Sequence, residues 1–154
     1  MPRYFGNTAL VGRLKNLLKL DRFKAFTFSV DKADTKHLII EMNTIDQLYK
    51  QGINSKGQSL KAIGGDYAYL TKDIKSHFNQ PFDRITLKDT GEFYESFNVR
   101  VTSTDFTIEA DTMKDEDLTI RWGEDIIGLT DENMQRLIDF CKIRYVEYVR
   151  QLLQ

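Results

Sequence analysis

The sequence has very few of the residues that build covalent or metal centres. It contains one cysteine, Cys141, and two histidines, so no internal disulfide can form. His37, His77 and Cys141 stand far apart in the chain and match no metal-ligand spacing, which argues against a zinc site or another bound metal. Neither histidine stands in a motif that would pair it with a serine or cysteine nucleophile. We therefore expect no metal, no cofactor and no enzymatic activity.

Long apolar runs are absent as well. No segment approaches the roughly 20 apolar residues that cross a bilayer, so the sequence predicts no membrane span. The first 20 residues contain no uninterrupted apolar stretch and no small-residue cleavage site. This argues against a signal peptide and for a protein of the cytoplasm or of an assembly formed there. With two prolines, no linker and no internal repeat, the chain is expected to form a single domain over residues 1–154.

Charge is plentiful and unevenly placed along the chain. The net charge is −1, yet residues 1–32 hold seven basic side chains against two acidic ones, and residues 105–132 hold ten acidic side chains against two basic ones. A basic segment suits nucleic acid, and two segments of opposite sign equally suit attraction between identical subunits. Two solvated surfaces of opposite sign are the third interpretation.

The N-terminal part contains one predicted helix and one undecided element. Thr8 can cap a helix that should extend to about Leu20. Its apolar positions are Leu10, Leu14, Leu17 and Leu18. Residues 22–30 fit a strand by a period of two and a helix by the spacing of their first two phenylalanines, so this element stays open. The residues concerned are Phe23, Phe26, Phe28 and Val30.

A second helix and a long loop are predicted next. Asp34 can cap a helix that ends at Gly52, the glycine position that commonly follows a helix C-terminus. From Gly52 to Lys72, glycines and small polar residues predict a long ordered loop in which Asn54–Gly57 forms a turn. Such a loop is able to reach a neighbouring subunit.

A short helix is predicted after this loop. Asp89 or Thr90 can cap it, and Gly91 permits its sharp start. Phe93 and Phe97 lie four residues apart on one face of this helix, where they can pack together. The residues around Gly91 are therefore interpreted as architectural, not catalytic.

A β-hairpin is predicted at about residues 97–111. Two runs alternate between apolar and polar side chains, with a turn at Ser103-Thr104 between them. The predicted cross-strand partners are Val99 and Val101 on one strand with Phe106 and Ile108 on the other.

The acidic segment after the hairpin does not resemble an ion site. Asp115, Glu116 and Asp117 are consecutive, so a helix would spread them around its axis instead of turning them toward one ion. We interpret them as a solvated turn at a helix N-terminus. Trp122 is interpreted as a core anchor, because a base-stacking platform would have basic residues around it.

The C-terminal helix is the clearest element. Thr130 can cap a helix over about residues 130–153, with acidic residues in its first turn. Its apolar stripe is Met134, Ile138, Cys141, Tyr145, Tyr148 and Leu152. We expect this face to pack on the protein's own sheet, with Cys141 as a small buried core residue, and a coiled-coil seam with another subunit is the alternative. The predicted fold class is α+β, with N-terminal helices, a small antiparallel sheet and this long helix.

Four segments in order resemble a known family. They are QLYKQGINSKGQSL, YLTKDIKSHFNQP, ITLKDTGEFYESFNV and DFTIEAD. Together they resemble the tail-completion or virion-morphogenesis proteins of tailed bacteriophages, in particular small neck proteins of phages of Bacteroidetes, including crAss-like ones. The matching positions are Gln51, Gly52, Asn54, Ser55, Gly57 and Leu60, then Leu87, Thr90, Gly91, Phe93 and Ser96. The resemblance covers about residues 47–130; Asn54 stands where aspartate is commoner, and the C-terminal helix lies outside the family pattern.

The resemblance implies a structural protein of the virion. Its copies would form a symmetric ring at the head-to-tail connector between portal and tail, contacting portal and other neck or tail proteins, with DNA in the lumen as a further candidate partner. In such a ring, a basic set on one copy is expected to lie near an acidic set on the next copy or on a stacked ring. The basic set is Lys15, Lys19, Arg22 and Lys24; the acidic set is Asp111, Asp115, Glu116 and Asp117.

Two other functions remain as alternatives. The first is a cytoplasmic nucleic-acid-binding regulator that uses the basic N-terminal segment, whose affinity would fall steeply with salt. The second is a small enzyme of an unrecognised type.

Overall fold

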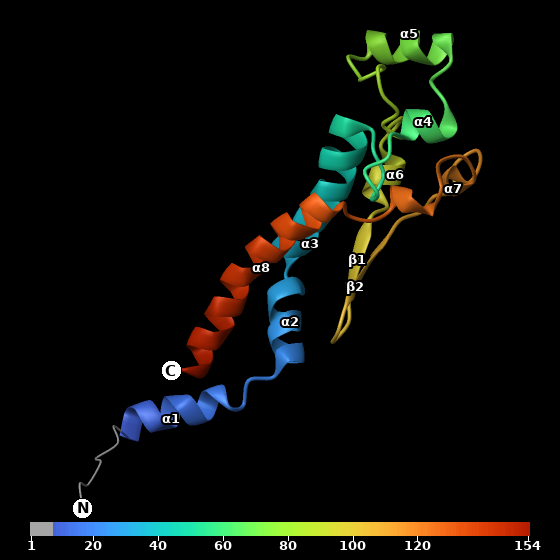
Figure 1. Ribbon diagram of the computed structural model, residues 1–154. Coiled ribbons are helices and arrows are strands. Elements are labelled where there is room, and N and C mark those ends of the chain that lie inside the picture. Colours follow the sequence, from blue (N-terminus) through green and yellow to red (C-terminus); the bar gives the residue numbers. More distant parts are fainter. Residues whose placement is uncertain (1–7) are drawn as a thin grey trace, which may run out of the picture.

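The computed structural model describes residues 8–154, and its fold is α+β, as predicted. The chain is elongated, with helix α1 (Thr8–Leu17) at one end and helix α5 (Tyr69–His77) at the other (Figure 1). Helix α8 (Asp131–Leu152) runs from the middle of the molecule back toward α1. Within the described residues, strands β1 (Asn98–Val101) and β2 (Phe106–Glu109) form one antiparallel sheet.

The first helix is shorter than predicted, and the undecided element is a helix. Helix α1 ends at Leu17, not near Leu20, because the chain turns at Leu18 and Lys19 and begins a new helix. The Asp21 carboxylate starts this helix, α2 (Arg22–Val30), by accepting hydrogen bonds from the backbone N–H of Phe23 at 2.9 Å and of Lys24 at 3.3 Å. A capping aspartate therefore decides in favour of the helix at residues 22–30.

The next predicted helix is two elements of different winding. Helix α3 (Ala33–Glu41) begins after Lys32, so Asp34 lies in its first turn and is not its cap. A ten-residue π-helix, η1 (Met42–Gln51), continues it without a break. Gly52 ends it in the left-handed conformation with φ +65°, as predicted. π-Helices are rare and usually one turn long, so the hydrophobic period of the sequence did not predict this one.

The predicted loop from Gly52 to Lys72 is partly wrong. The Asn54–Gly57 turn is present, with a bond from the Gly57 N–H to the Asn54 carbonyl at 3.0 Å and φ +73° at Gly57. The rest contains helix α4 (Leu60–Gly64) and the start of α5. Leu60 is completely buried, and its burial fixes α4 where the glycines predicted irregular backbone.

The hairpin has the predicted register. Val99 pairs with Ile108 and Val101 with Phe106, because only this pairing puts the apolar side chains on the same face. The short helix α6 (Glu92–Glu95) precedes it. Its N-cap position is held by Gly91, not by the predicted Asp89 or Thr90.

The C-terminal helix begins at its predicted cap, after two short elements. Helix α7 (Leu118–Trp122) is capped by Asp117, a 3-10 turn η2 (Glu124–Ile126) follows, and α8 begins at the predicted Thr130 cap. The apolar face of α8 packs chiefly on α2 and not chiefly on the sheet, although Leu137 shares a buried cluster with Val99 of the hairpin. The reason is that residues 22–30 form a helix long enough to lie along α8. Cys141 is half-buried there and packs against the core, so the predicted burial is only partial.

Two clusters of buried side chains form the core. One lies around Trp122 and comprises Leu48, Leu60, Ile85, Leu87, Phe93, Phe97, Leu118, Trp122 and Ile126. The other joins the helices to the hairpin and comprises Val30, Ile39, Met42, Val99 and Leu137. Ile40 and Ile108 pack against both clusters, so the two halves of the elongated molecule share side chains.

Candidate functional site

The first motif segment, residues 51–60, forms a turn organised by the Asn54 side chain. The Asn54 side chain is buried, and its Oδ1 accepts hydrogen bonds from the N–H groups of Lys56 at 3.0 Å and Gln58 at 2.9 Å. Ser55 donates its N–H to the Asp125 carbonyl at 2.8 Å. An asparagine meets these needs as well as an aspartate would, because the amide nitrogen of Asn54 also donates to the Gln58 side chain at 3.1 Å.

The second motif segment, residues 87–96, turns the chain into the hairpin. Gly91 has φ +103° and directly precedes α6 as its N-cap residue. The Thr90 hydroxyl accepts a hydrogen bond from the Glu92 N–H at 3.4 Å. Ser96 donates its hydroxyl to the Phe93 carbonyl at 2.7 Å and accepts from the Asp111 N–H at 2.9 Å. Ser96 thereby ties α6 to the segment that leaves the hairpin.

The two motif segments meet in one core. Leu60 comes from the first segment, and Leu87 and Phe93 come from the second; all three belong to the cluster around Trp122. Phe93 and Phe97 pack edge to face, with ring centroids 5.1 Å apart, as their spacing predicted. Gln51 lies at the surface and Gly52 is buried. The motif residues therefore build the frame of the molecule, and they do not converge on a chemical centre.

Replacing Gly91 with valine should destabilise this frame by about 2 kcal/mol, because a β-branched residue is strained at positive φ. No side chain blocks the added Cβ closely, since its nearest contact would be the Glu95 carboxylate at 3.8 Å. The cost therefore comes from the backbone. Thermal melting monitored by circular dichroism measures it. An unchanged melting temperature would contradict this role of Gly91.

A buried amide network, which the sequence did not reveal, joins η1 to the start of α8. Asn43 donates to the Ile126 carbonyl at 3.0 Å and accepts from the Gly128 N–H at 2.8 Å. Gln47, four residues later in η1, makes the same pair of bonds two residues further along the 126–130 segment. It donates to the Gly128 carbonyl at 2.9 Å and accepts from the Thr130 N–H at 2.9 Å. The two side chains thus pair with residues 126–130 as a neighbouring strand would.

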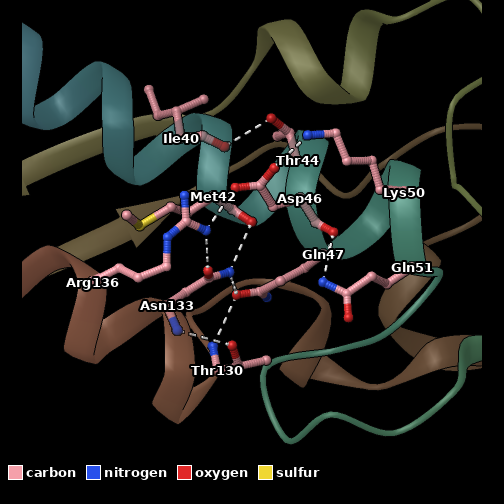
Figure 2. Close-up of polar contacts among 10 residues, drawn as sticks. All are labelled: Ile40, Met42, Thr44, Asp46, Gln47, Lys50, Gln51, Thr130, Asn133 and Arg136. Carbon is pink, nitrogen blue, oxygen red and sulfur yellow. Dashed lines mark hydrogen bonds and ion pairs between the residues drawn. The ribbon is translucent and has the colours of Figure 1, made fainter.

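Asn133 and an ion cluster complete the network (Figure 2). The Asn133 amide donates to Gln47 Oε1 at 2.9 Å, and Arg136 donates to Asn133 Oδ1 at 2.8 Å. The Asp46 carboxylate forms ion pairs with Arg136 at 2.9 Å and with Lys50 at 2.8 Å. The hydrogen bond from Lys50, with Arg136, lowers the pKa of Asp46. Because every buried amide group here is satisfied, the network fixes the angle between η1 and α8.

The predicted basic set lies on α1, on α2 and between them. Lys15, Lys19, Arg22 and Lys24 are all exposed, as is Arg13 beside them. Within residues 8–154, none of the five forms an ion pair with a carboxylate. This end of the molecule therefore carries positive charge that the described chain does not neutralise.

The predicted acidic set lies near α7, in the other half of the molecule. Asp111, Asp115 and Glu116 are exposed, and none of them pairs with a cation among the described residues. Asp117 has a different role, because its carboxylate caps α7 by accepting from the Thr119 N–H at 3.0 Å, a bond that lowers the pKa of Asp117. Asp117 therefore acts within its own chain, unlike the other three residues of the acidic set.

The fold separates the two charged sets. Figure 1 shows α1 and α2 in the lower part of the molecule, while α7 and the segment before it lie in the upper part, on the side away from α8. The basic and acidic sets therefore cannot neutralise one another within one chain. They remain available to a second molecule.

A groove between α2 and α8 lies beside the basic set. Its volume is about 430 Å³, and Phe26, Phe106, Ile138, Cys141 and Tyr145 give it an apolar lining. Burial in this lining raises the pKa of the Cys141 thiol, which is half-buried.

Within residues 8–154, no three His, Cys, Asp or Glu side chains converge to hold a metal ion. No helix in the same range is long and apolar enough to cross a membrane. His37 and His77 are exposed, each near a carboxylate one turn away on its own helix.

Comparisons of the chain with protein-family models, with curated proteins and with solved structures found no match.

Proposed function

We propose that this chain is a non-enzymatic structural subunit of a tailed-phage virion, whose copies form a ring at the head-to-tail connector between portal and tail. The observation that supports this best is the separation of unneutralised basic and acidic sets on one elongated subunit. A closed ring uses heterologous contacts, in which one surface of each copy meets a different surface of the next. Two surfaces of opposite charge meet that requirement. The resemblance of residues 47–130 to neck proteins supports the virion context.

The charges and the apolar surfaces have different roles in this proposal. Exposed ion pairs contribute only about 0–1 kcal/mol each, so the charged sets steer subunits together and set their register. Apolar contacts supply most of the affinity. The free protein is therefore expected to be a monomer in dilute solution and to form its ring on the portal. The remaining partners are the neighbouring neck or tail proteins, and DNA in the lumen.

Reversing part of the acidic set tests the proposal. The variant Asp115→Lys with Glu116→Lys leaves the Asp117 cap of α7 intact, so the monomer should melt like the wild type. Loss of two attractions and gain of two repulsions should lower incorporation into virions about tenfold, as a change of roughly 1.4 kcal/mol does. Quantitative mass spectrometry of purified particles measures incorporation, and immunogold labelling locates the chain at the neck.

A matched variant controls for net charge. Glu41→Lys with Glu132→Lys changes the charge equally at two exposed carboxylates outside the acidic set, and it should enter virions at the wild-type level. Normal incorporation of the Asp115 and Glu116 variant would overturn the steering role of these charges. Absence of the wild-type chain from purified virions would overturn the virion function itself.

The exposed basic set also favours a second candidate, a nucleic-acid-binding regulator. Phosphate contacts release counterions, so binding through these residues would weaken steeply as salt rises, with a log–log slope of about −0.9 per contacted phosphate of duplex DNA. A gel-shift titration with duplex DNA at several salt concentrations measures this slope. Tight, salt-sensitive binding by a chain that is absent from virions would favour the regulator.

A further inference from the structure

A pocket of about 630 Å³ lies between α5 and α7, in the upper part of the molecule in Figure 1. Leu87, Leu118 and Trp122 line it and are buried, whereas Ile74 and Phe78 line it and are exposed. The pocket is therefore open to solvent beside α5. Small-molecule sites have volumes of about 300–1,000 Å³ and a mostly apolar lining with a few placed polar groups, and this pocket has both properties.

One wall of the pocket contains a buried cation, Lys75, which is 6% exposed. Its Nζ donates to the Lys88 carbonyl at 2.7 Å and to Gln80 Oε1 at 3.0 Å, and it lies 4.9 Å from the centroid of the Tyr67 ring. All three partners are uncharged, and Lys75 forms no ion pair with a carboxylate among residues 8–154. An ammonium has three N–H donors, and only two have acceptors in the described chain. Because buried lysines are ordinarily paired with an opposite charge, this ammonium is a recognition point for an anion.

The other charged residues of the pocket do not neutralise Lys75. Lys114 pairs with Asp89 at 3.0 Å. Lys88 has no carboxylate partner in the described chain, and its Nζ lies over two tyrosine rings, 5.1 Å and 5.9 Å from their centroids. Asp115 is exposed, so water and salt screen its charge more than they screen a buried one. The lining thus holds three lysines against two aspartates, and its buried charge is positive.

We propose that this pocket binds a small molecule that carries one anionic group, a carboxylate or a phosphate, on an aromatic or apolar body. The anionic group accepts the remaining N–H of Lys75, and the body packs against the apolar wall that includes Phe78 and Trp122. A neutral ligand would leave the buried ammonium without a counter-charge, and a cationic ligand would meet it with like charge. The proposal goes beyond ring formation and does not rest on it.

One aromatic side chain reports directly on this pocket. Trp122 lines it and is the only tryptophan of the chain, so its indole N–H gives a single signal in a proton–nitrogen NMR spectrum of the full chain. The probes are naphthoate, naphthyl phosphate and the neutral naphthylmethanol. Both anions should shift the Trp122 signal saturably. Naphthylmethanol should bind at least about tenfold more weakly, because it lacks the charge-assisted hydrogen bond to Lys75.

The two anionic probes also distinguish the sources of the anionic group. Tighter binding of naphthoate identifies a carboxylate ligand, and tighter binding of naphthyl phosphate identifies a phosphate ester. Equal affinity for naphthylmethanol would overturn the proposal, because the pocket would then select only for an apolar body. The absence of a saturable shift with either anion at millimolar concentration would overturn it as well.

Substitutions locate the binding site of the probe. Lys75→Met keeps the length of the side chain and removes its charge, so it should weaken naphthoate binding about tenfold. Ile74 is 49% exposed, so a charge there does not depend on refolding the core. Ile74→Glu should weaken naphthoate binding about threefold relative to Ile74→Gln, and Asp115→Asn should strengthen it by a similar factor, the size expected for an exposed charge. This second group decides the matter if Lys75→Met does not fold.

The α2–α8 groove supplies the matched control. Ile138 lines that groove and is 45% exposed, so Ile138→Glu makes the same charge change at another apolar site and should leave naphthoate binding unchanged. A folded Lys75→Met variant with wild-type affinity would overturn the proposal. Binding that responds to Ile138→Glu and not to Ile74→Glu would place the probe in the groove and overturn it too. All of these measurements use the purified chain, so their outcome is independent of whether the chain enters virions.

Discussion

Replacing Gln47 with leucine should lower the free energy of unfolding by about 4 kcal/mol, because it leaves several buried polar groups without partners at a cost of roughly 1–3 kcal/mol each. Gln47 is completely buried. Its amide bonds the Gly128 carbonyl, the Thr130 N–H and the Asn133 side chain. Leucine fills similar space but satisfies none of them. Urea denaturation followed by circular dichroism measures the loss.

The same helix offers a matched control for this substitution. Gln51 is exposed and makes one side-chain hydrogen bond, to the Asp46 carbonyl at 3.0 Å. Gln51→Leu should change the free energy of unfolding by no more than about 0.5 kcal/mol, as exposed substitutions usually do. If Gln47→Leu and Gln51→Leu prove equally stable, the amide network does not hold η1 to α8.

Adding a single methyl group at Gly64 should cost about 3 kcal/mol, because the site is already filled and overpacking forces side chains from their rotamers. A Cβ at Gly64 would lie 2.5 Å from Trp122 Nε1 and 2.7 Å from its Cδ1. The indole cannot swing away freely, since Trp122 is 8% exposed in the core. Arg121 also holds Gly64 in place by donating its Nε–H to the Gly64 carbonyl at 2.7 Å.

The melting temperature reports this cost. For a chain of this size, 3 kcal/mol corresponds to a fall of roughly 6–12 °C. Gly12→Ala is the control, because a Cβ there meets nothing within 4 Å and should stabilise α1 by up to about 1 kcal/mol. Equal melting of Gly64→Ala and the wild type would mean that the Trp122 ring yields and does not clamp α4.

Local signals in the sequence predicted the elements whose cause is local. The Thr130 cap, the Gly52 terminus and the Val99–Ile108 pairing each depend on neighbours in the same helix or hairpin. Helix α5 was not predicted although Leu70 and Ile74 stand at helical spacing, because the glycines before them favour irregular backbone. The signal that distinguishes a helix from a strand at residues 22–30 is Asp21, a favourable N-cap residue directly before them.

The candidate site depended on contacts that no local pattern contains. Asn43 and Gln47 are polar residues on a helix, and polar helix positions ordinarily face water. Here they are buried, because their amides pair with backbone groups more than 80 residues away in the sequence, as with Asn43 and Ile126 at a separation of 83. Only the folded chain brings residues 126–130 to this helix face.

By itself the sequence determined the α+β class, the hairpin register, the C-terminal helix and the existence of two oppositely charged segments. Charge and short-range spacing are properties of the chain itself, so they can be read before it folds. The tertiary structure alone decided that the charged segments lie apart, and that Leu70, Ile74 and Phe78 of the α5 region and the α2–α8 groove remain uncovered. Those features depend on which surfaces the core leaves exposed, and packing between distant segments sets that.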